Sequence, residues 1–84
     1  MVYRAALEEY RRDLVPLDWA MSYGNQGVAL CDLARRKRDR AMAQQALAQI
    51  IAAESEMRAG GHLPLADYYA GQIPDAKALV AELE

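Results

Sequence analysis

The chain has 84 residues, a formal charge of −2 and an isoelectric point near 5.3. This length suits one small domain, and the mild acidity argues against a dedicated nucleic-acid binder. With a single cysteine and a single histidine, the chain cannot form an internal disulfide or a structural zinc site by itself. We find no signal-peptide core and no membrane-length apolar run, so we expect a cytoplasmic protein without a membrane partner.

The composition predicts an all-α protein. Ala, Leu, Glu, Gln, Arg and Met dominate, β-branched residues are sparse and Phe is absent. The dominant residue types lose little side-chain entropy in a helix. Apolar residues at spacings of three and four predict a first helix over residues 2–15, which Pro16 ends. Asp18 is expected to cap a second helix, and the basic run RRKRDR (35–40) suits the end of that helix.

Three further helices are expected after the basic run. Asp39 is predicted to cap a third helix, which carries the longest apolar stripe and ends at the glycine pair 60–61. Pro64 is predicted to open a short fourth helix over residues 65–70, closed by Gly71. Pro74 is predicted to open a fifth over residues 75–84. The sequence therefore predicts about five helices, the fourth short, in one domain spanning residues 1–84.

The stretch GNQG, Gly24 to Gly27, raises the question of whether it is a ligand loop or part of the second helix. A phosphate-binding loop follows a strand, whereas here helical periodicity runs on both sides. We therefore predict a helix, at a cost of about 1 kcal/mol per glycine relative to alanine. Gly27 lies on the apolar seam, where a second helix could approach, so Gly27→Leu should destabilise by overpacking. Gly24 lies on an adjacent face, so Gly24→Ala is expected to be neutral or stabilising.

Residues 16 to about 58 resemble a tetratricopeptide repeat. In that family a proline precedes an aromatic residue and a small glycine in the first helix, and alanines flank a large apolar residue in the second. The bacterial variety is most similar, and the corresponding stretches of this chain are PLDWA, NQG and VAL. The residues that match these roles in order are Pro16, Trp19 or Tyr23, Gly27, Ala46, Ile50 and Ala53, and all of them after Pro16 are predicted helix-packing residues.

The resemblance implies an antiparallel helix-turn-helix array, with residues 2–15 as the last helix of a preceding repeat and residues 60–84 as an irregular helical cap. Gln26 stands where the family usually has a large apolar residue, and RRKRDRA is expected to lengthen the connection between the two helices. About three repeats are normally needed for stability, and this chain has one complete pair. We therefore expect a homodimer or larger oligomer; a fragment or remnant of a longer repeat protein is the alternative.

The resemblance implies a non-catalytic interaction module or small scaffold, which we expect to bind a protein or peptide in a groove between the first and second helices or at an oligomer face. Asn25 and Asp32 are the candidate partner-binding residues of the second helix, because they are polar and lie off the apolar seam. Tyr68 and Tyr69 are further candidate partner-binding residues. Adjacent helical residues point about 100° apart, so only one of the two rings can face the core and the other is open to a partner.

The alternative function is a nucleic-acid-associated regulatory role for the basic patch, which consists of Arg35, Arg36, Lys37, Arg38 and Arg40. The patch has no interleaved aromatic residues for base stacking, so a solvated helix end is favoured. His62 and Cys31 lack a motif that would supply a catalytic partner. Five carboxylates lack the Glu-x-x-His spacing of metal sites in helix bundles, so we assign them to solvated helix surface: Glu8, Glu9, Asp13, Glu54 and Glu56. We therefore predict no enzymatic activity, cofactor or metal.

Overall fold

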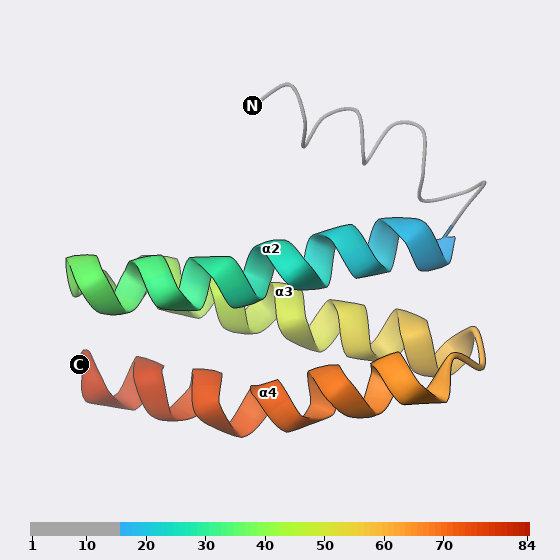
Figure 1. The fold of residues 1–84 in the computed structure, drawn as a ribbon. Helices are drawn as coiled ribbons and strands as arrows, with labels where there is room; N and C mark the ends of the chain where they lie inside the picture. The colour runs from blue at the N-terminus through green and yellow to red at the C-terminus, as the bar shows by residue number, and fades with distance from the viewer. Residues whose placement is uncertain (1–15) are drawn as a thin grey trace.

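The computed structural model describes residues 16–84, which form three α-helices and no strand: α2 (Pro16–Lys37), α3 (Arg40–Ala59) and α4 (Leu63–Glu82). The predicted all-α class is confirmed for these residues. Each helix runs antiparallel to the one before it, so α2 and α4 run parallel to each other (Figure 1). The helix predicted over residues 2–15 lies outside the described residues.

The structure corrects the predicted number of helices. The expected fourth and fifth helices are one helix, α4, which continues through Gly71 and Pro74. The proposed irregular cap is therefore a regular helix. A proline inside a helix removes a hydrogen bond and costs about 3 kcal/mol. The helix continues because the turns before and after Pro74 bury the same face, so packing outweighs the local cost; the residues of that face are Ala66, Tyr69, Ala76 and Leu79.

The connections between the helices are short. The basic run does not lengthen the first one, since only Arg38 and Asp39 separate α2 from α3. Arg38 adopts the left-handed conformation with φ 55°, and Asp39 caps α3 by accepting a hydrogen bond from the Met42 amide at 3.0 Å. The predicted cap at Asp39 is confirmed. The predicted end of α3 is also confirmed, since α3 stops at Ala59 and Gly61 follows with φ 79°.

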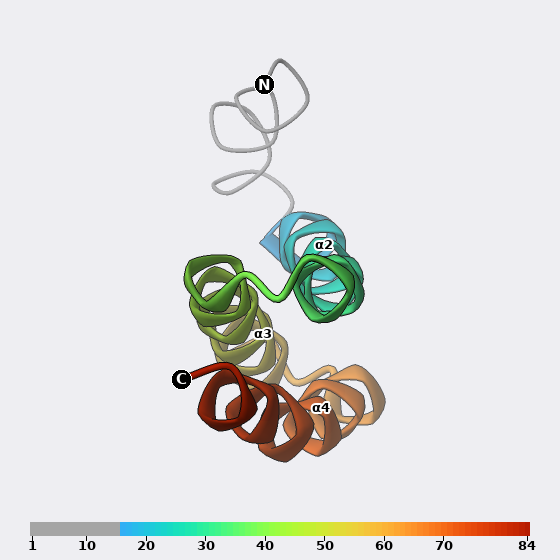
Figure 2. The same cartoon turned by 90° about the vertical axis from the view of Figure 1, so that its left-hand side faces the viewer.

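The three helices form an arc with α3 in the middle. α3 packs against α2 on one side and α4 on the other, whereas α2 and α4 make few contacts with each other. Figure 2 shows this arc along the helix axes. The buried face of α3 is narrow and rich in alanine, which lets both neighbours approach closely; it consists of Ala43, Ala46, Gln49, Ile50, Ala53 and Met57.

Both glycines of GNQG lie buried within α2. A Cβ on Gly27 would lie 3.0 Å from Ile50 Cγ1 and 3.1 Å from the main-chain oxygen of Ala46. A Cβ on Gly24 would lie 2.6 Å from the Tyr69 ring and 2.7 Å from the Ala53 Cβ. Gly24 is therefore the more tightly packed of the two. This packing argues against the expectation that Gly24→Ala is neutral or stabilising, because the face of α2 that carries Gly24 is covered by both α3 and α4.

We predict that Gly24→Ala lowers the free energy of unfolding by about 1–3 kcal/mol, because the Tyr69 ring and the Ala53 methyl group must move. Gly71→Ala is the matched control, since a Cβ there would meet no atom within 4 Å. It should stabilise α4 by about 0.4–1 kcal/mol. Urea unfolding curves of the two variants measure both effects. Equal stabilisation by both substitutions would contradict the close packing at Gly24.

Candidate functional site

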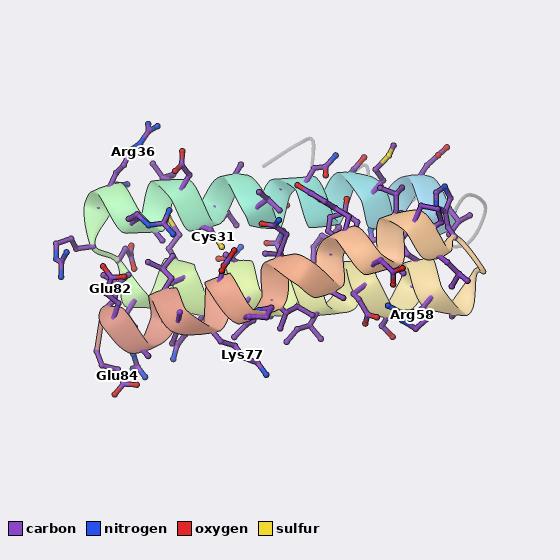
Figure 3. All side chains as sticks on the ribbon, turned by 60° about the horizontal axis from the view of Figure 1, so that its bottom comes forward. Cys31, Arg36, Arg58, Lys77, Glu82 and Glu84 are labelled. Atoms are coloured by element: carbon purple, nitrogen blue, oxygen red, sulfur yellow. The ribbon has the colours of Figure 1, made fainter. Side chains whose placement is uncertain are left out.

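A groove of about 490 Å³ lies between the C-terminal halves of α2 and α4. Figure 3 shows Cys31 of α2 and Glu82 of α4 in the space between these two ribbons. On each helix the lining residues are adjacent or lie at offsets of three and four positions, so each helix presents one stripe to the groove. The α2 stripe is Val28, Ala29, Cys31, Asp32 and Arg35, and the α4 stripe is Gln72, Asp75, Ala76, Ala78, Leu79 and Glu82.

The floor of the groove is apolar and its walls are polar. Ala76 and Leu79 are buried, and Val28 and Cys31 are half-buried beside them. Ala29 and Ala78 are exposed on the two sides, where their small side chains leave the groove open. An apolar floor with a polar wall is the arrangement that accepts an amphipathic segment of another chain.

The charges of the groove are unevenly paired. Asp32 forms ion pairs with Arg35 at 3.7 Å and with Arg36 at 3.1 Å. Asp75 and Glu82 have no ion-pair partner among residues 16–84. The last turn of α4 contains no basic residue, so the carboxylate of Glu82 lies at the negative end of the helix dipole with no cation of that turn to offset this unfavourable interaction. Three carboxylates therefore face the groove against one guanidinium, that of Arg35.

Cys31 lies in the groove between charges of both signs. Burial raises the pKa of its thiol above 9.0; Arg35 lowers it and Asp75 raises it, and the net shift is upward. The thiol is therefore protonated near neutral pH, and a protonated thiol is a poor nucleophile. Because Cys31 is the only cysteine of the chain, its reaction with a thiol reagent reports on the groove alone.

The four candidate partner-binding residues have different surroundings. Asp32 lines the groove, whereas Asn25 is exposed about two turns earlier on α2. Tyr68 is 46% exposed, whereas Tyr69 is fully buried and packs edge-on against the Tyr68 ring. The single proton of the Tyr69 hydroxyl is shared between two acceptors, Asn25 Oδ1 at 2.8 Å and the main-chain oxygen of Met21 at 3.1 Å. Asn25 and Tyr69 thus join α2 to α4, and Tyr69 is not available to a partner.

A buried glutamine, which the sequence analysis did not single out, joins α2 to α3. Gln49 Nε2 donates to the Tyr23 main-chain oxygen at 3.1 Å and to Gln26 Oε1 at 3.0 Å. Gln49 Oε1 accepts from Gln45 Nε2 at 3.1 Å, so the buried amide is hydrogen-bonded at both ends. Gln26, the departure from the tetratricopeptide pattern, therefore faces a polar partner. A glutamine in the apolar stripe of α3 was the signal that could have indicated this pair.

The predicted packing residues of α3 are all buried: Ala46, Ile50 and Ala53. On α2, Trp19 is buried, and the half-buried Tyr23 ring stacks on it with ring centroids 4.8 Å apart.

His62 is exposed immediately before α4. No cluster of metal-ligating side chains occurs among the described residues. The carboxylate of Glu54 pairs with Arg58, and Glu56 is half-buried.

The basic patch lies at the turn between α2 and α3, and the chain itself pairs several of its cations. Arg35 and Arg36 share Asp32, and Arg40 lies 3.6 Å from Glu84. The other two members of the patch, Lys37 and Arg38, are exposed. The patch therefore presents less uncompensated charge than the sequence suggests.

No protein-family model, curated protein or solved structure matches this chain. Among the residues that the structure describes, no helix combines the length and apolarity needed to cross a membrane. The groove is therefore the feature of the described residues from which we infer a function.

We predict a specific alkaline instability from Tyr69. Burial, and secondarily the neighbouring Tyr68, raises the pKa of its hydroxyl above 10.0. A group with a raised pKa in the folded state contributes stability below its unfolded pKa, and this contribution is lost as pH rises through the folded value. Tyr69→Phe should lower the free energy of unfolding at pH 7 by about 1 kcal/mol, because it removes the hydrogen bonds of the hydroxyl. The variant should also show a weaker decline of stability above pH 10, because it has no hydroxyl to ionise at this position.

The control is Tyr68→Phe, which alters the exposed neighbouring ring and should preserve the stability at pH 7. Thermal unfolding from pH 7 to pH 11 compares the two variants with the original chain. The same loss at pH 7 in both variants would show that the hydroxyl of Tyr69 has no special role.

Proposed function

We propose that this protein is a non-catalytic interaction module of tetratricopeptide-like architecture, which binds a peptide segment of another protein between α2 and α4. The observation that carries the proposal is the groove itself, with an apolar floor, polar walls and exposed alanines at its sides. A volume of about 490 Å³ accommodates several side chains of a bound segment. We assign the module to the cytoplasm, since a reducing compartment suits a lone thiol.

The helix arrangement supports the tetratricopeptide-like assignment. α2 and α3 are an antiparallel pair with a two-residue connection, and they pack through Gly27 and Ala46. α4 stands where the first helix of a following repeat would stand. α2 and α4 then correspond to the successive first helices, which form the concave side of such an array.

The nucleic-acid alternative has weaker support. Arg35, Arg36 and Arg40 are engaged with carboxylates of the chain, and the patch has no aromatic residue on which bases could stack. A nucleic-acid ligand would bind with a steep salt dependence through the exposed cations of residues 35–40. A peptide in the groove would instead depend on the side chains between α2 and α4.

We predict that Ala78→Trp abolishes peptide binding, because the indole fills the groove from the exposed side of α4. Ala48→Trp is the matched control, since Ala48 is exposed on α3 and does not line the groove. Peptides selected from a random display library on the original chain should bind the Ala48→Trp variant and fail to bind Ala78→Trp. They should also slow the reaction of Cys31 with a thiol reagent. Equal binding to both variants would rule out the groove as the peptide site.

We also propose that the chain self-associates, because a short repeat array leaves apolar helix surface uncovered. Leu63 is 52% exposed and Ile51 is 42% exposed. Light scattering at micromolar concentrations should give the mass of a dimer or a larger oligomer, and replacing both residues with Gln should shift the mass toward the monomer. A monomer mass for the original chain across this range would refute the proposal.

A further inference from the structure

We propose that the groove selects a basic amphipathic helix, with lysine or arginine side chains two turns apart and an aliphatic side chain between them. This inference rests on the proposed peptide-binding function and specifies the chemistry of the peptide. It follows from three residues of α4, Asp75, Leu79 and Glu82, which line the groove at positions i, i+4 and i+7.

The two carboxylates are available to a ligand, whereas the third carboxylate of the groove is already compensated. Asp32 is held by two arginines, at 3.1 and 3.7 Å. Asp75 and Glu82 have no such partner within the described part of the chain. Outside the basic run, the cations of residues 16–84 are Arg58 and Lys77 alone, so the body of the molecule is acidic. A basic ligand therefore complements the groove, and an acidic one is repelled.

The spacing of the carboxylates determines the spacing of the ligand's cations. Seven residues of an α-helix span about 10 Å, so Asp75 and Glu82 lie about that far apart along α4. A helix lying along the groove presents side chains with the same separation at its own positions i and i+7. Leu79, which is buried between the two carboxylates, then faces an aliphatic side chain at i+3 or i+4 of the ligand.

The position of Glu82 strengthens the argument for a cationic ligand. Its carboxylate lies in the last turn of α4, where the helix dipole is negative and no basic residue of that turn offsets it. A cation from a bound helix would interact favourably with both the carboxylate and the end of the helix. Arg35 on the opposite wall does not supply this cation, since its guanidinium forms an ion pair with Asp32.

Two fluorescein-labelled, alanine-rich peptides of equal length test the inference. Both carry leucine at i+3 and i+4; positions i and i+7 are lysine in one peptide and glutamate in the other. Fluorescence anisotropy should show the lysine peptide binding at least about ten-fold more tightly than the glutamate peptide, with a preference that shrinks in salt. The lysine peptide should also slow the reaction of Cys31 with a thiol reagent.

A matched pair of double variants locates the interaction. Asp75→Asn with Glu82→Gln should weaken binding of the lysine peptide about three- to ten-fold, as expected for two exposed ion pairs. Asp67→Asn with Glu56→Gln changes the net charge equally, at residues that do not line the groove, and should leave binding unchanged. Equal losses in the two double variants would overturn the inference, because the attraction would then be to the overall charge.

The remaining outcomes separate this inference from the proposed function. If both peptides bind equally and Ala78→Trp abolishes binding of each, the groove binds peptides and the charge selection is wrong. If neither peptide binds or protects Cys31, the charge selection is also wrong. The display selection then decides the proposed function. That function is wrong if no selected peptide binds the Ala48→Trp variant and fails to bind the Ala78→Trp variant.

Discussion

The contact between the Tyr69 ring and the backbone at Gly24 is the constraint on which the arrangement of the three helices depends. The ring occupies the space that a Cβ on Gly24 would need, at a distance of 2.6 Å from that position. α4 packs mainly against α3 and touches α2 little, so this contact and the hydroxyl bonds to Asn25 and Met21 are the direct links that hold α4 in register with α2. The far wall of the groove is a surface of α4. The shape of the candidate site is therefore set by a buried contact outside it.

The GNQG stretch combines packing with polar contacts to both neighbouring helices. Gly27 lets α3 approach and Gly24 admits the Tyr69 ring, while Asn25 bonds to α4 and Gln26 bonds to Gln49 of α3. A glycine inside a helix costs about 1 kcal/mol, which close packing must offset. The buried Gln49 amide adds specificity, because a shift of α3 along α2 would leave its hydrogen bonds unmade.

The groove depends on a different set of residues on the same two helices. Small exposed side chains at Ala29 and Ala78 keep it open, and the buried Leu79 provides its floor. Helical periodicity lets α4 turn one face to α3 and an adjacent face to the groove. The carboxylates on that second face that have no ion-pair partner among residues 16–84 add no evident stability, which is why we interpret them as ligand contacts.

The sequence by itself determined the all-α class of the described residues, the cap at Asp39 and the end of α3 at the glycine pair, since these follow from side-chain entropy and local backbone preferences. It also indicated that GNQG is helical and that Asp32 is a candidate contact residue. Only the tertiary structure decided that α4 continues through Pro74, that Gly24 is more closely packed than Gly27, and that Asp75 and Glu82 face α2 across a groove. The physical reason is that burial against α3 outweighs the local preference of a proline, and helix packing decides which side chains meet.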